Sequence, residues 1–242
     1  MILELSEEQK AVRDAARDFA QNVLKPGVIE RDNAQRFPAE EIKQLGELGF
    51  MGMMVDPKYG GSGMDTVSYV LAMEELSKID ASASVCVSVN NSLVCWGLEE
   101  YGTEEQKEKY LAPLARGEKI GAFCLSEPEA GSDATSQRTT AIDMGDHYLL
   151  NGTKNWITNG PQADTGVLMC MTDPAAGHRG ISAFVVDMNG EGVRRGPKDD
   201  KLGIRASHSC QVFFEDHRVS ATQRLGQEGD GFKVAMSTLA AG

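Results

Sequence analysis

The sequence lacks any cluster of positive charge. Of its 242 residues, 24 are Lys or Arg and 36 are Asp or Glu, which gives a formal net charge of −12. No basic run is longer than Arg194-Arg195. Nucleic-acid binding needs clustered Lys and Arg, so we expect no nucleic-acid partner. An acidic surface of this kind is compatible with a protein partner that presents basic residues.

Long hydrophobic runs and export signals are also missing. No apolar run approaches the ~20 residues that cross a bilayer, and the N-terminus becomes charged within four residues. The cysteines contain no Cys-x-x-Cys pair, so we expect buried free thiols in a reducing compartment. These features predict a cytoplasmic protein without a membrane span, or alternatively a protein of the mitochondrial matrix. The five cysteines are Cys86, Cys95, Cys124, Cys170 and Cys210.

Common nucleotide, nucleophile and metal signatures are absent too. Gly61-Ser62-Gly63 lacks the third glycine and the preceding strand of a Rossmann fingerprint. No Walker A sequence and no nucleophile elbow occur. None of the four histidines falls in a metal-ligand pattern except His208, which alternates with Cys210 on one strand face. Two such residues do not make a zinc pattern, so we predict no metal site.

The composition is otherwise that of a folded protein, with 41% apolar and 25% charged residues. Helical periodicity dominates the first ~118 residues. Capping boxes begin at Ser6 and Thr103, and Asp65 and Asp80 are candidate N-caps. Pro38 is expected at the first position of a further helix. A helical domain over residues 1–118 is the prediction.

Strand-like runs replace this pattern from about residue 120. Asn151-Gly152 separates two of the runs and predicts a hairpin turn. Short strands with local connections indicate an antiparallel barrel or sandwich over 119–228. From Gly229 the pattern is helical again and continues to Gly242 without a cap, which predicts the beginning of a third, helical domain over 229–242. The expected strands are 120–125, 139–144, 147–150, 154–158, 166–172, 181–187 and 209–214.

Two segments could carry chemistry. The run from Phe123 to Asp133 reads as a strand that breaks at Pro128 into a loop rich in small and hydroxyl residues. Such a loop can aim N–H and O–H groups at an anion or a polar heterocycle. The run Trp156 to Gly160 places an aromatic and a hydroxyl at a strand end. On residues alone, an ordinary strand-to-turn transition and a core tryptophan are the favoured readings.

Several segments, in order, resemble the acyl-CoA dehydrogenase family along essentially the whole chain. Their residues are YGTEEQKEKYLAPL (101–114), GAFCLSEPEAGSD (121–133), LNGTKNWITNG (150–160), GISAFVV (180–186), DKLGIRAS (200–207) and LGQEGDGFKVAMSTLAAG (225–242). SVNNSL (88–93) is most similar to the short-chain, butyryl-type branch. The resemblance implies an α+β multidomain fold: an N-terminal all-α domain, an antiparallel β-barrel domain and a C-terminal helical bundle, assembled as a homotetramer.

The same resemblance implies that FAD is the cofactor. Main-chain groups of Leu125 and Ser126, with the Ser126 hydroxyl, would face the N1/O2 edge of the flavin ring, and Thr158 would lie near N5. Trp156 and Ile157 would pack against the ring. Ser132 would also contact the acyl-CoA substrate. The full cofactor-binding set is Phe123, Cys124, Leu125, Ser126, Gly131, Ser132, Trp156, Ile157 and Thr158.

The implied reaction is α,β-dehydrogenation of a short-chain acyl-CoA to the trans-2-enoyl-CoA. A carboxylate takes the α-proton, and electrons then pass to electron-transferring flavoprotein. In the short-chain branch the catalytic Glu lies past Gly242, so no catalytic base is expected within this chain and neither Glu127 nor Glu129 is assigned that role. Ala240 departs from the family's D-x-x-R pattern, which puts a coenzyme A contact there in doubt.

Residues 1–242 alone are therefore expected to lack activity and to hold FAD weakly. Two alternatives stay open. An acyl-CoA oxidase has the same fold and cofactor but passes electrons to oxygen, and a non-catalytic scaffold subunit would keep only the fold.

Overall fold

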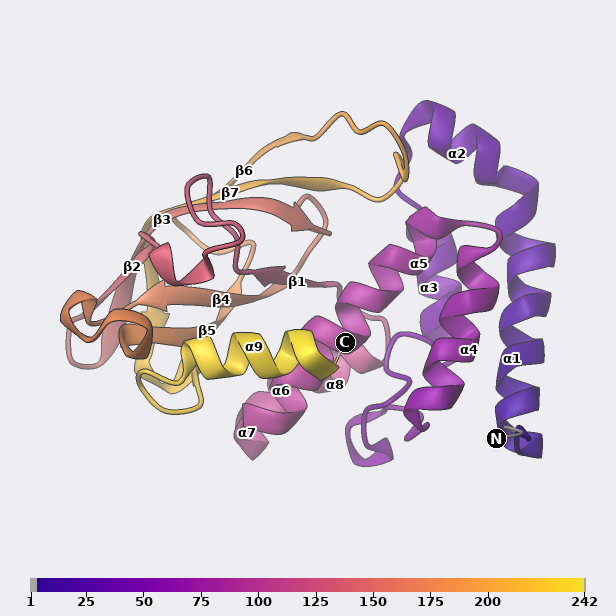
Figure 1. Ribbon diagram of the computed structural model, residues 1–242, viewed down its shortest axis with the longest axis horizontal. Coiled ribbons are helices and arrows are strands. Elements are labelled where there is room, and N and C mark those ends of the chain that lie inside the picture. Colours follow the sequence, from indigo (N-terminus) through magenta and orange to yellow (C-terminus); the bar gives the residue numbers. More distant parts are fainter. Residues whose placement is uncertain (1–3, 242) are drawn as a thin grey trace.

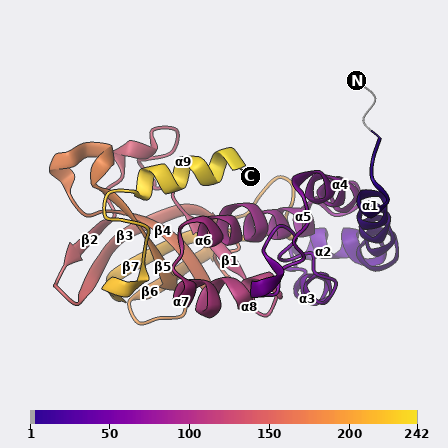
Figure 2. The ribbon, with the colours of Figure 1, turned by 90° about the horizontal axis from the view of Figure 1, so that it is seen from below.

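The computed structural model describes residues 4–241. Helices occupy one side of the molecule and a β-sheet the other, and the last helix, α9 (Gly231–Ala241), returns along the sheet to lie beside α6 (Figures 1 and 2). Within the described range, no helix is both long enough and apolar enough to cross a membrane.

Up to Ala115 the regular structure of the described chain is helical, as predicted. The capping boxes at Ser6 and Thr103 are present, and Asp65 and Asp80 cap their helices. Pro38 lies one position earlier than predicted, at the cap itself. The α-helices are α1 Glu7–Phe19, α2 Val28–Ala34, α3 Ala39–Glu47, α4 Thr66–Ser77, α5 Ala81–Ser88, α6 Trp96–Tyr101, α7 Glu104–Gln106 and α8 Ala112–Ala115; π-helical segments are η1 Ala20–Leu24, η4 Val89–Cys95 and η5 Lys107–Leu111, and 3₁₀ turns are η2 Lys25–Gly27 and η3 Pro57–Tyr59.

Eight strands form one sheet in the order β6-β7-β3-β2-β4-β5-β8, and β1 pairs with β4 off this path. Most pairs are antiparallel, but β1 and β2 each run parallel to β4. The strands are β1 Gly121–Cys124, β2 Thr140–Asp143, β3 His147–Thr158, β4 Thr165–Met171, β5 Ile181–Asp187, β6 Val193–Lys198, β7 Ser209–Ser220 and β8 Arg224–Leu225, with 3₁₀ turns η6 Ala134–Ser136, η7 Pro174–Gly180 and η8 Ala221–Gln223.

The predicted helical domain followed by a mostly antiparallel β domain is confirmed, but the prediction of a barrel is wrong. Among the described residues, β6 and β8 form the two ends of the sheet and do not pair with each other, so the sheet is open. Strand β6 was not predicted, because its sequence VRRGPK has neither apolar alternation nor β-branched residues beyond Val193. Its Arg, Gly and Pro residues suit an edge strand that pairs on one side only.

The hairpin predicted at Asn151-Gly152 is also wrong. Strand β3 continues through both residues, and its register against β7 shifts between Leu150 and Gly152. Gly152 has φ 150°, and a Cβ there would lie 2.5 Å from Thr139 Oγ1. The glycine is therefore needed for a β-bulge and for the close approach of the neighbouring strand. These requirements favour the same Asn-Gly sequence that a hairpin turn does.

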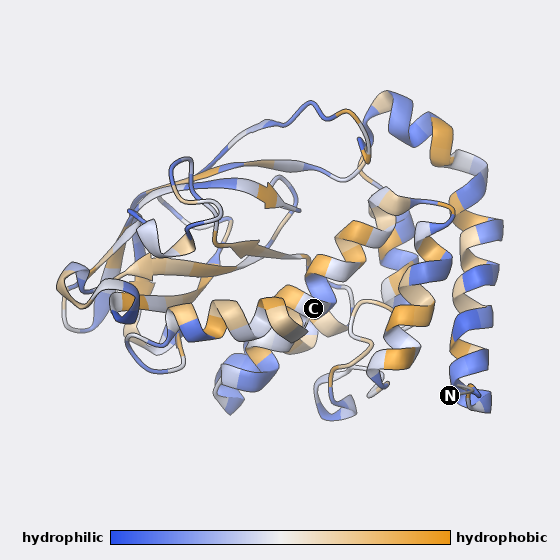
Figure 3. Cartoon of the chain, viewed as in Figure 1, coloured by the Kyte–Doolittle hydropathy of each residue, from blue (hydrophilic) through white to orange (hydrophobic). Residues whose placement is uncertain are grey.

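The hydrophobic core has three parts. One lies within the helices, one lies between helices and sheet, and the third covers the far face of the sheet. Strand β4 shows the division, since Val167 and Met169 face the helices while Leu168 and Cys170 face away. Figure 3 shows the hydrophobic residues along β4, β5 and α9 where these elements meet. This packing holds the ends of β1 and β3 close to η4 and α9.

Candidate functional site

The ends of β1 and β3 meet at a cavity of about 440 Å³. Helical segments η4 and α9 supply apolar side chains to it, and the loop after β1 supplies hydroxyls. The lining residues are Val89, Leu93, Phe123, Leu125, Ser126, Gly131, Ser132, Ala134, Asn155, Trp156, Ile157, Thr158, Met236 and Leu239. Eight of the nine cofactor-binding residues expected from the sequence therefore come together here. They do so although Phe123 on β1 and Trp156 on β3 lie 33 positions apart in the chain.

The ninth residue, Cys124, points the other way. Successive side chains of a strand alternate between its two faces, so Cys124 belongs to the core on the far side of the sheet and is fully buried. Burial raises the pKa of its thiol to about 12. The Cys124 side chain does not line the cavity.

Trp156 reaches the cavity because β3 is irregular at this point. The register of β3 against β7 shifts between Lys154 and Ile157, and Trp156 takes the left-handed conformation with φ 58°. A bulge of this kind re-aims a side chain. The indole is 65% exposed, whereas its neighbour Ile157 is buried. The expectation of a core tryptophan that the residues alone favoured is therefore wrong for Trp156.

Two hydrogen bonds from β3 hold the loop after β1 in place, and both are accepted by successive carbonyl oxygens of that loop. Lys154 Nζ donates to the Leu125 oxygen over 3.1 Å, and the Asn155 N–H donates to the Ser126 oxygen over 2.8 Å. The loop then closes on itself through the main chains of Glu127 and Ala130. The main-chain positions of Leu125 and Ser126 are thus fixed by the strand that also carries Trp156 and Thr158.

Several donors at the cavity have no partner within the described part of the chain. These are the hydroxyls of Ser126, Ser132 and Thr158 and the main-chain N–H of Ser126. At Gly131 an added Cβ would meet nothing within 4 Å, so this glycine borders open space. The arrangement is an apolar cavity with a few converging polar groups, which is the usual form of a small-molecule site.

Sequence reasoning missed part of the cavity wall. Val89 and Leu93 come from the π-helical segment η4, and Asn155 lies inside the β3 bulge. Met236 and Leu239 lie in the predicted helical segment 229–242, which was assigned only to the beginning of a third domain. Apolar residues at helical spacing do not reveal which cavity they border, so the sequence held no separate signal for these residues.

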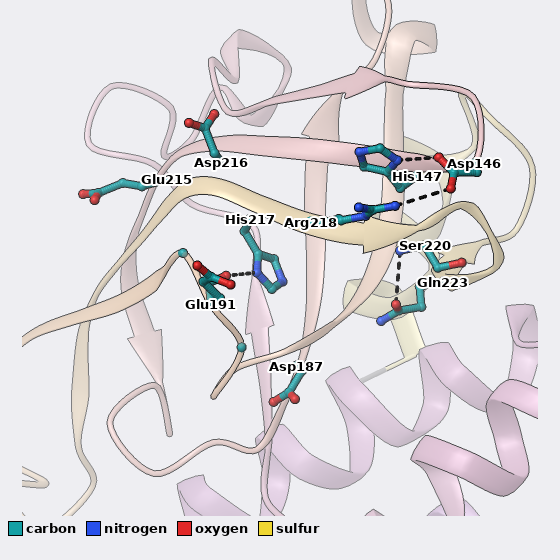
Figure 4. Close-up of a pocket in the computed structure, with 12 residues that line it drawn as sticks. Asp146, His147, Asp187, Glu191, Glu215, Asp216, His217, Arg218, Ser220 and Gln223 are labelled. Atoms are coloured by element: carbon teal, nitrogen blue, oxygen red, sulfur yellow. Dashed lines mark hydrogen bonds and ion pairs between the residues drawn. The ribbon is translucent and has the colours of Figure 1, made fainter.

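A larger cavity, of about 700 Å³, lies at the opposite end of β3 and β7, and Figure 4 shows its lining. Three of its charged groups pair with one another, since Asp146 contacts both His147 and Arg218. The Nδ1 of His217 bonds to the main-chain carbonyl of Glu191. None of the residues expected from the sequence to bind cofactor lines it.

The pair His208 and Cys210 has ordinary structural roles. His208 Nδ1 lies 2.8 Å from the Gln162 amide nitrogen, and Nε2 lies 2.8 Å from the Gln35 carbonyl oxygen. Burial lowers the pKa of His208, which keeps the imidazole neutral. Cys210 is fully buried. Over residues 4–241, no group of three or more His, Cys, Asp or Glu side chains has a geometry that could hold a metal ion.

Comparison with known proteins agrees with the arrangement of helices, sheet and cavity. The model of the acyl-CoA dehydrogenase N-terminal domain matches residues 6–118, and the model of the acyl-CoA dehydrogenase middle domain matches residues 122–217. A short-chain specific acyl-CoA dehydrogenase of Clostridium acetobutylicum is 48% identical over all 242 residues.

Solved structures match equally well. Butyryl-CoA dehydrogenase of Megasphaera elsdenii is 43% identical, with a TM-score of 0.97 over the whole chain. A structure described as electron transferring flavoprotein of Acidaminococcus fermentans contains a chain that is 47% identical, with a TM-score of 0.98 over the whole chain. The present chain spans 64% of the length of the Clostridium relative, 64% of the Megasphaera chain and 63% of the Acidaminococcus chain. The chain belongs to the acyl-CoA dehydrogenase family, of which it comprises the N-terminal and middle domains.

Proposed function

We propose that the cavity between β1 and β3 binds FAD and that the protein dehydrogenates a short-chain acyl-CoA to the trans-2-enoyl-CoA. One observation carries the proposal: donors without protein partners, from Ser126 and Thr158, converge on an apolar cavity beside an exposed indole. Members of this family are flavoproteins, and a related glutaryl-CoA dehydrogenase structure holds the reduced cofactor.

The proposed domain boundaries are 1–118 for the N-terminal helical domain, 119–228 for the middle β domain and 229–242 for the beginning of the C-terminal helical domain.

The residues present fit an isoalloxazine ring. Its faces are apolar and suit Trp156 and Ile157, while its pyrimidine edge needs hydrogen-bond donors. When bound, FAD supplies the atom that accepts a hydride from the substrate β-carbon. Ser126 supplies its N–H and Oγ–H to the N1/O2 edge, and Thr158 supplies its hydroxyl near N5. Phe123 and Gly131 belong to the proposed cofactor-binding set because they line the cavity, whereas Cys124 could contribute to it through its main chain alone.

The substrate is proposed to enter beside the loop after β1. Ser132 is exposed at the cavity rim and serves both cofactor and acyl-CoA. The described residues that line the cavity include no Asp, Glu or His. This supports the proposal that the proton acceptor is a Glu from outside the described residues, past Gly242, and that residues 1–242 alone do not turn over.

We propose electron-transferring flavoprotein as the electron acceptor and a homotetramer as the assembly, in the cytoplasm or the mitochondrial matrix. One structure that matches this chain is described by the name of that flavoprotein, and a 44% identical relative is a subunit of the caffeyl-CoA reductase-Etf complex of Acetobacterium woodii.

Anaerobic titration of the complete encoded protein tests the proposal. We expect it to purify with FAD or take it up, and butyryl-CoA to bleach the flavin absorbance. A protein that neither binds FAD nor responds to butyryl-CoA would contradict the proposal, and the scaffold alternative would then hold. Steady hydrogen peroxide formation without added electron-transferring flavoprotein would select an oxidase instead. Residues 1–242 alone serve as the comparison and are expected to give no turnover.

A further inference from the structure

A fully buried ammonium group lies directly behind the cavity. Lys154 is 0% exposed, and its Nζ has three oxygen partners: Glu127 Oε1 at 2.7 Å, Gln137 Oε1 at 3.0 Å and the Leu125 carbonyl oxygen at 3.1 Å. An ammonium has three donors, so all of them are used. Burial of a charge is costly unless it is paired and hydrogen-bonded, so a lysine here calls for a role beyond filling space.

The Leu125 carbonyl that accepts from Lys154 belongs to the same peptide group as the Ser126 N–H. The described chain contains no cis peptide bond, and in a trans peptide the C=O and N–H point in opposite directions. Because the oxygen points back toward buried Lys154, the N–H points away from it. Ser126 lines the cavity, and its N–H has no other partner within the described residues.

Glu127 completes the arrangement by balancing the charge. Its carboxylate accepts from Lys154 and from the main-chain N–H groups of Arg138 and Thr139, at 2.6 and 3.1 Å. Burial would raise the pKa of Glu127, but the Lys154 charge and these donors outweigh it, so the pKa lies below its ordinary value. The carboxylate therefore stays charged, and the pair is a fixed dipole whose positive end contacts the Leu125 carbonyl.

We propose that Lys154 is a positioning residue for the flavin site: held by Glu127 and Gln137, it orients the Leu125–Ser126 peptide and makes the Ser126 N–H a stronger donor toward the cavity. This inference rests on the proposed function, because it takes the flavin edge as the acceptor. Hydrogen bonds in a chain polarise one another, and a charged donor on a carbonyl strengthens the N–H of the same peptide.

A stronger donor at the N1/O2 edge favours the reduced cofactor, since that edge carries more negative charge after reduction. Lys154 therefore sets the reduction potential of bound FAD as well as its affinity. A residue that only supports the fold would change affinity and stability without a selective effect on the potential.

Three variants of the complete encoded protein separate the effect of Lys154 on the Leu125–Ser126 peptide from the effect of an unpaired buried charge. Lys154→Met removes the donor and leaves Glu127 unpaired, and Lys154→Met with Glu127→Gln removes both charges. Glu127→Gln alone leaves the ammonium without its counter-ion. The control is Val212→Ala, which opens a cavity in the core at the residue that pairs with Lys154 on β7 but removes no polar contact.

The measurements are the FAD dissociation constant and the reduction potential of bound FAD. Lys154→Met should lower the preference for the reduced over the oxidised cofactor about tenfold, which is a shift of about 30 mV to more negative potential for two electrons. The double variant should keep about half of that shift, about 15 mV, because only the peptide effect remains. Glu127→Gln should shift the potential to more positive values, and Val212→Ala should leave it unchanged.

Each outcome has one meaning. If wild-type protein binds FAD but Lys154→Met and the double variant keep the wild-type potential, the inference is overturned and the proposed function stands. Wild-type protein that binds no FAD overturns both. If Lys154→Met does not fold, the double variant, which leaves no unpaired charge, decides by the same measurement. A double variant that also fails to fold, while Val212→Ala folds, overturns the positioning role in favour of a purely structural one.

Discussion

At the scale of single residues, Trp156 combines two properties that rarely occur together. A bulky side chain with φ 58° is strained by about 1–2 kcal/mol, and an exposed indole gains little from burial. A residue chosen for stability alone would relieve the strain. The geometry therefore favours a role in binding, where the indole would be covered by a flat ligand.

This reasoning predicts opposite effects of Trp156→Gly on stability and on binding. Glycine tolerates the left-handed conformation, so the melting temperature should stay the same or rise slightly. FAD affinity should fall about tenfold, the value of one aromatic contact. The control is Gln35→Gly, another left-handed position with φ 50° that lies away from the cavity. Thermal unfolding and fluorescence titration with FAD check both, and a large loss of stability in Trp156→Gly would contradict the account.

Also at this scale, the limits of sequence reasoning are visible in Lys154. Its partners lie 17, 27 and 29 positions away, so no local pattern reveals the contacts. Helix caps were predictable because each depends on residues three positions apart, as at Ser6 and Gln9. Most of the proposed flavin-site residues were identified through the resemblance to a family, since the residues alone favoured an ordinary turn and a core tryptophan.

At the scale of elements, β3 shows why the hairpin prediction failed. A glycine with unusual φ is needed at a tight turn and also at a bulge, and Asn-Gly does not distinguish them. The choice depends on β7, which pairs with β3 across the bulge and lies about sixty residues later in the chain. The barrel prediction failed for the same reason, because the local sequence does not show whether two distant edge strands pair with each other.

The bulge predicts a strong effect of Gly152→Ala. The added Cβ would lie 2.5 Å from Thr139 Oγ1 and 2.6 Å from its Cα, at φ 150°. Strain and overpacking together should lower the free energy of unfolding by about 2 kcal/mol. The control is Gly203→Ala, where an added Cβ meets nothing within 4 Å. Denaturant unfolding measures both, and equal stability of the two variants would show that the contact is not tight.

The packing of α1 against α4 predicts a dependence on pH. Arg17 donates to both oxygens of Glu75, which lies on α4, and this ion pair, together with a contact from Lys78, lowers the pKa of Glu75 to about 2. A carboxyl whose pKa is lower in the folded state stabilises the fold above its unfolded pKa of about 4.5, and this contribution is lost as the pH falls toward 2.

Glu75→Gln should therefore cost roughly 1 kcal/mol of unfolding free energy at pH 7, a value reduced because Arg17 is partly exposed. The difference from wild type should shrink below pH 4.5 and vanish near pH 2. Glu74→Gln, next to it and exposed, should cost less than about 0.5 kcal/mol at any pH. Urea unfolding at several pH values provides the check, and a constant cost of Glu75→Gln across them would exclude the ion pair as its cause.

At the scale of the whole molecule, the cavity depends on three separate parts. Its wall comes from the helical segment η4, from the strand ends of β1 and β3 and from the returning helix α9. Figures 1 and 2 show how α9 runs back along the sheet. The helices pack on one face of the sheet and leave the Leu125–Ser126 loop facing α9. A fold of this kind brings distant donors to one place without a continuous sequence motif.

The central claim is that this cavity, and no other, holds the flavin ring. A crystal structure of the complete encoded protein with FAD tests it most directly. We expect the ring against Trp156 and Ile157, with its N1/O2 edge within hydrogen-bond distance of the Ser126 N–H and N5 near the Thr158 hydroxyl. A ring bound in the acidic cavity at the other end of β3, or a ring turned so that Ser126 and Thr158 contact neither edge, would contradict the account.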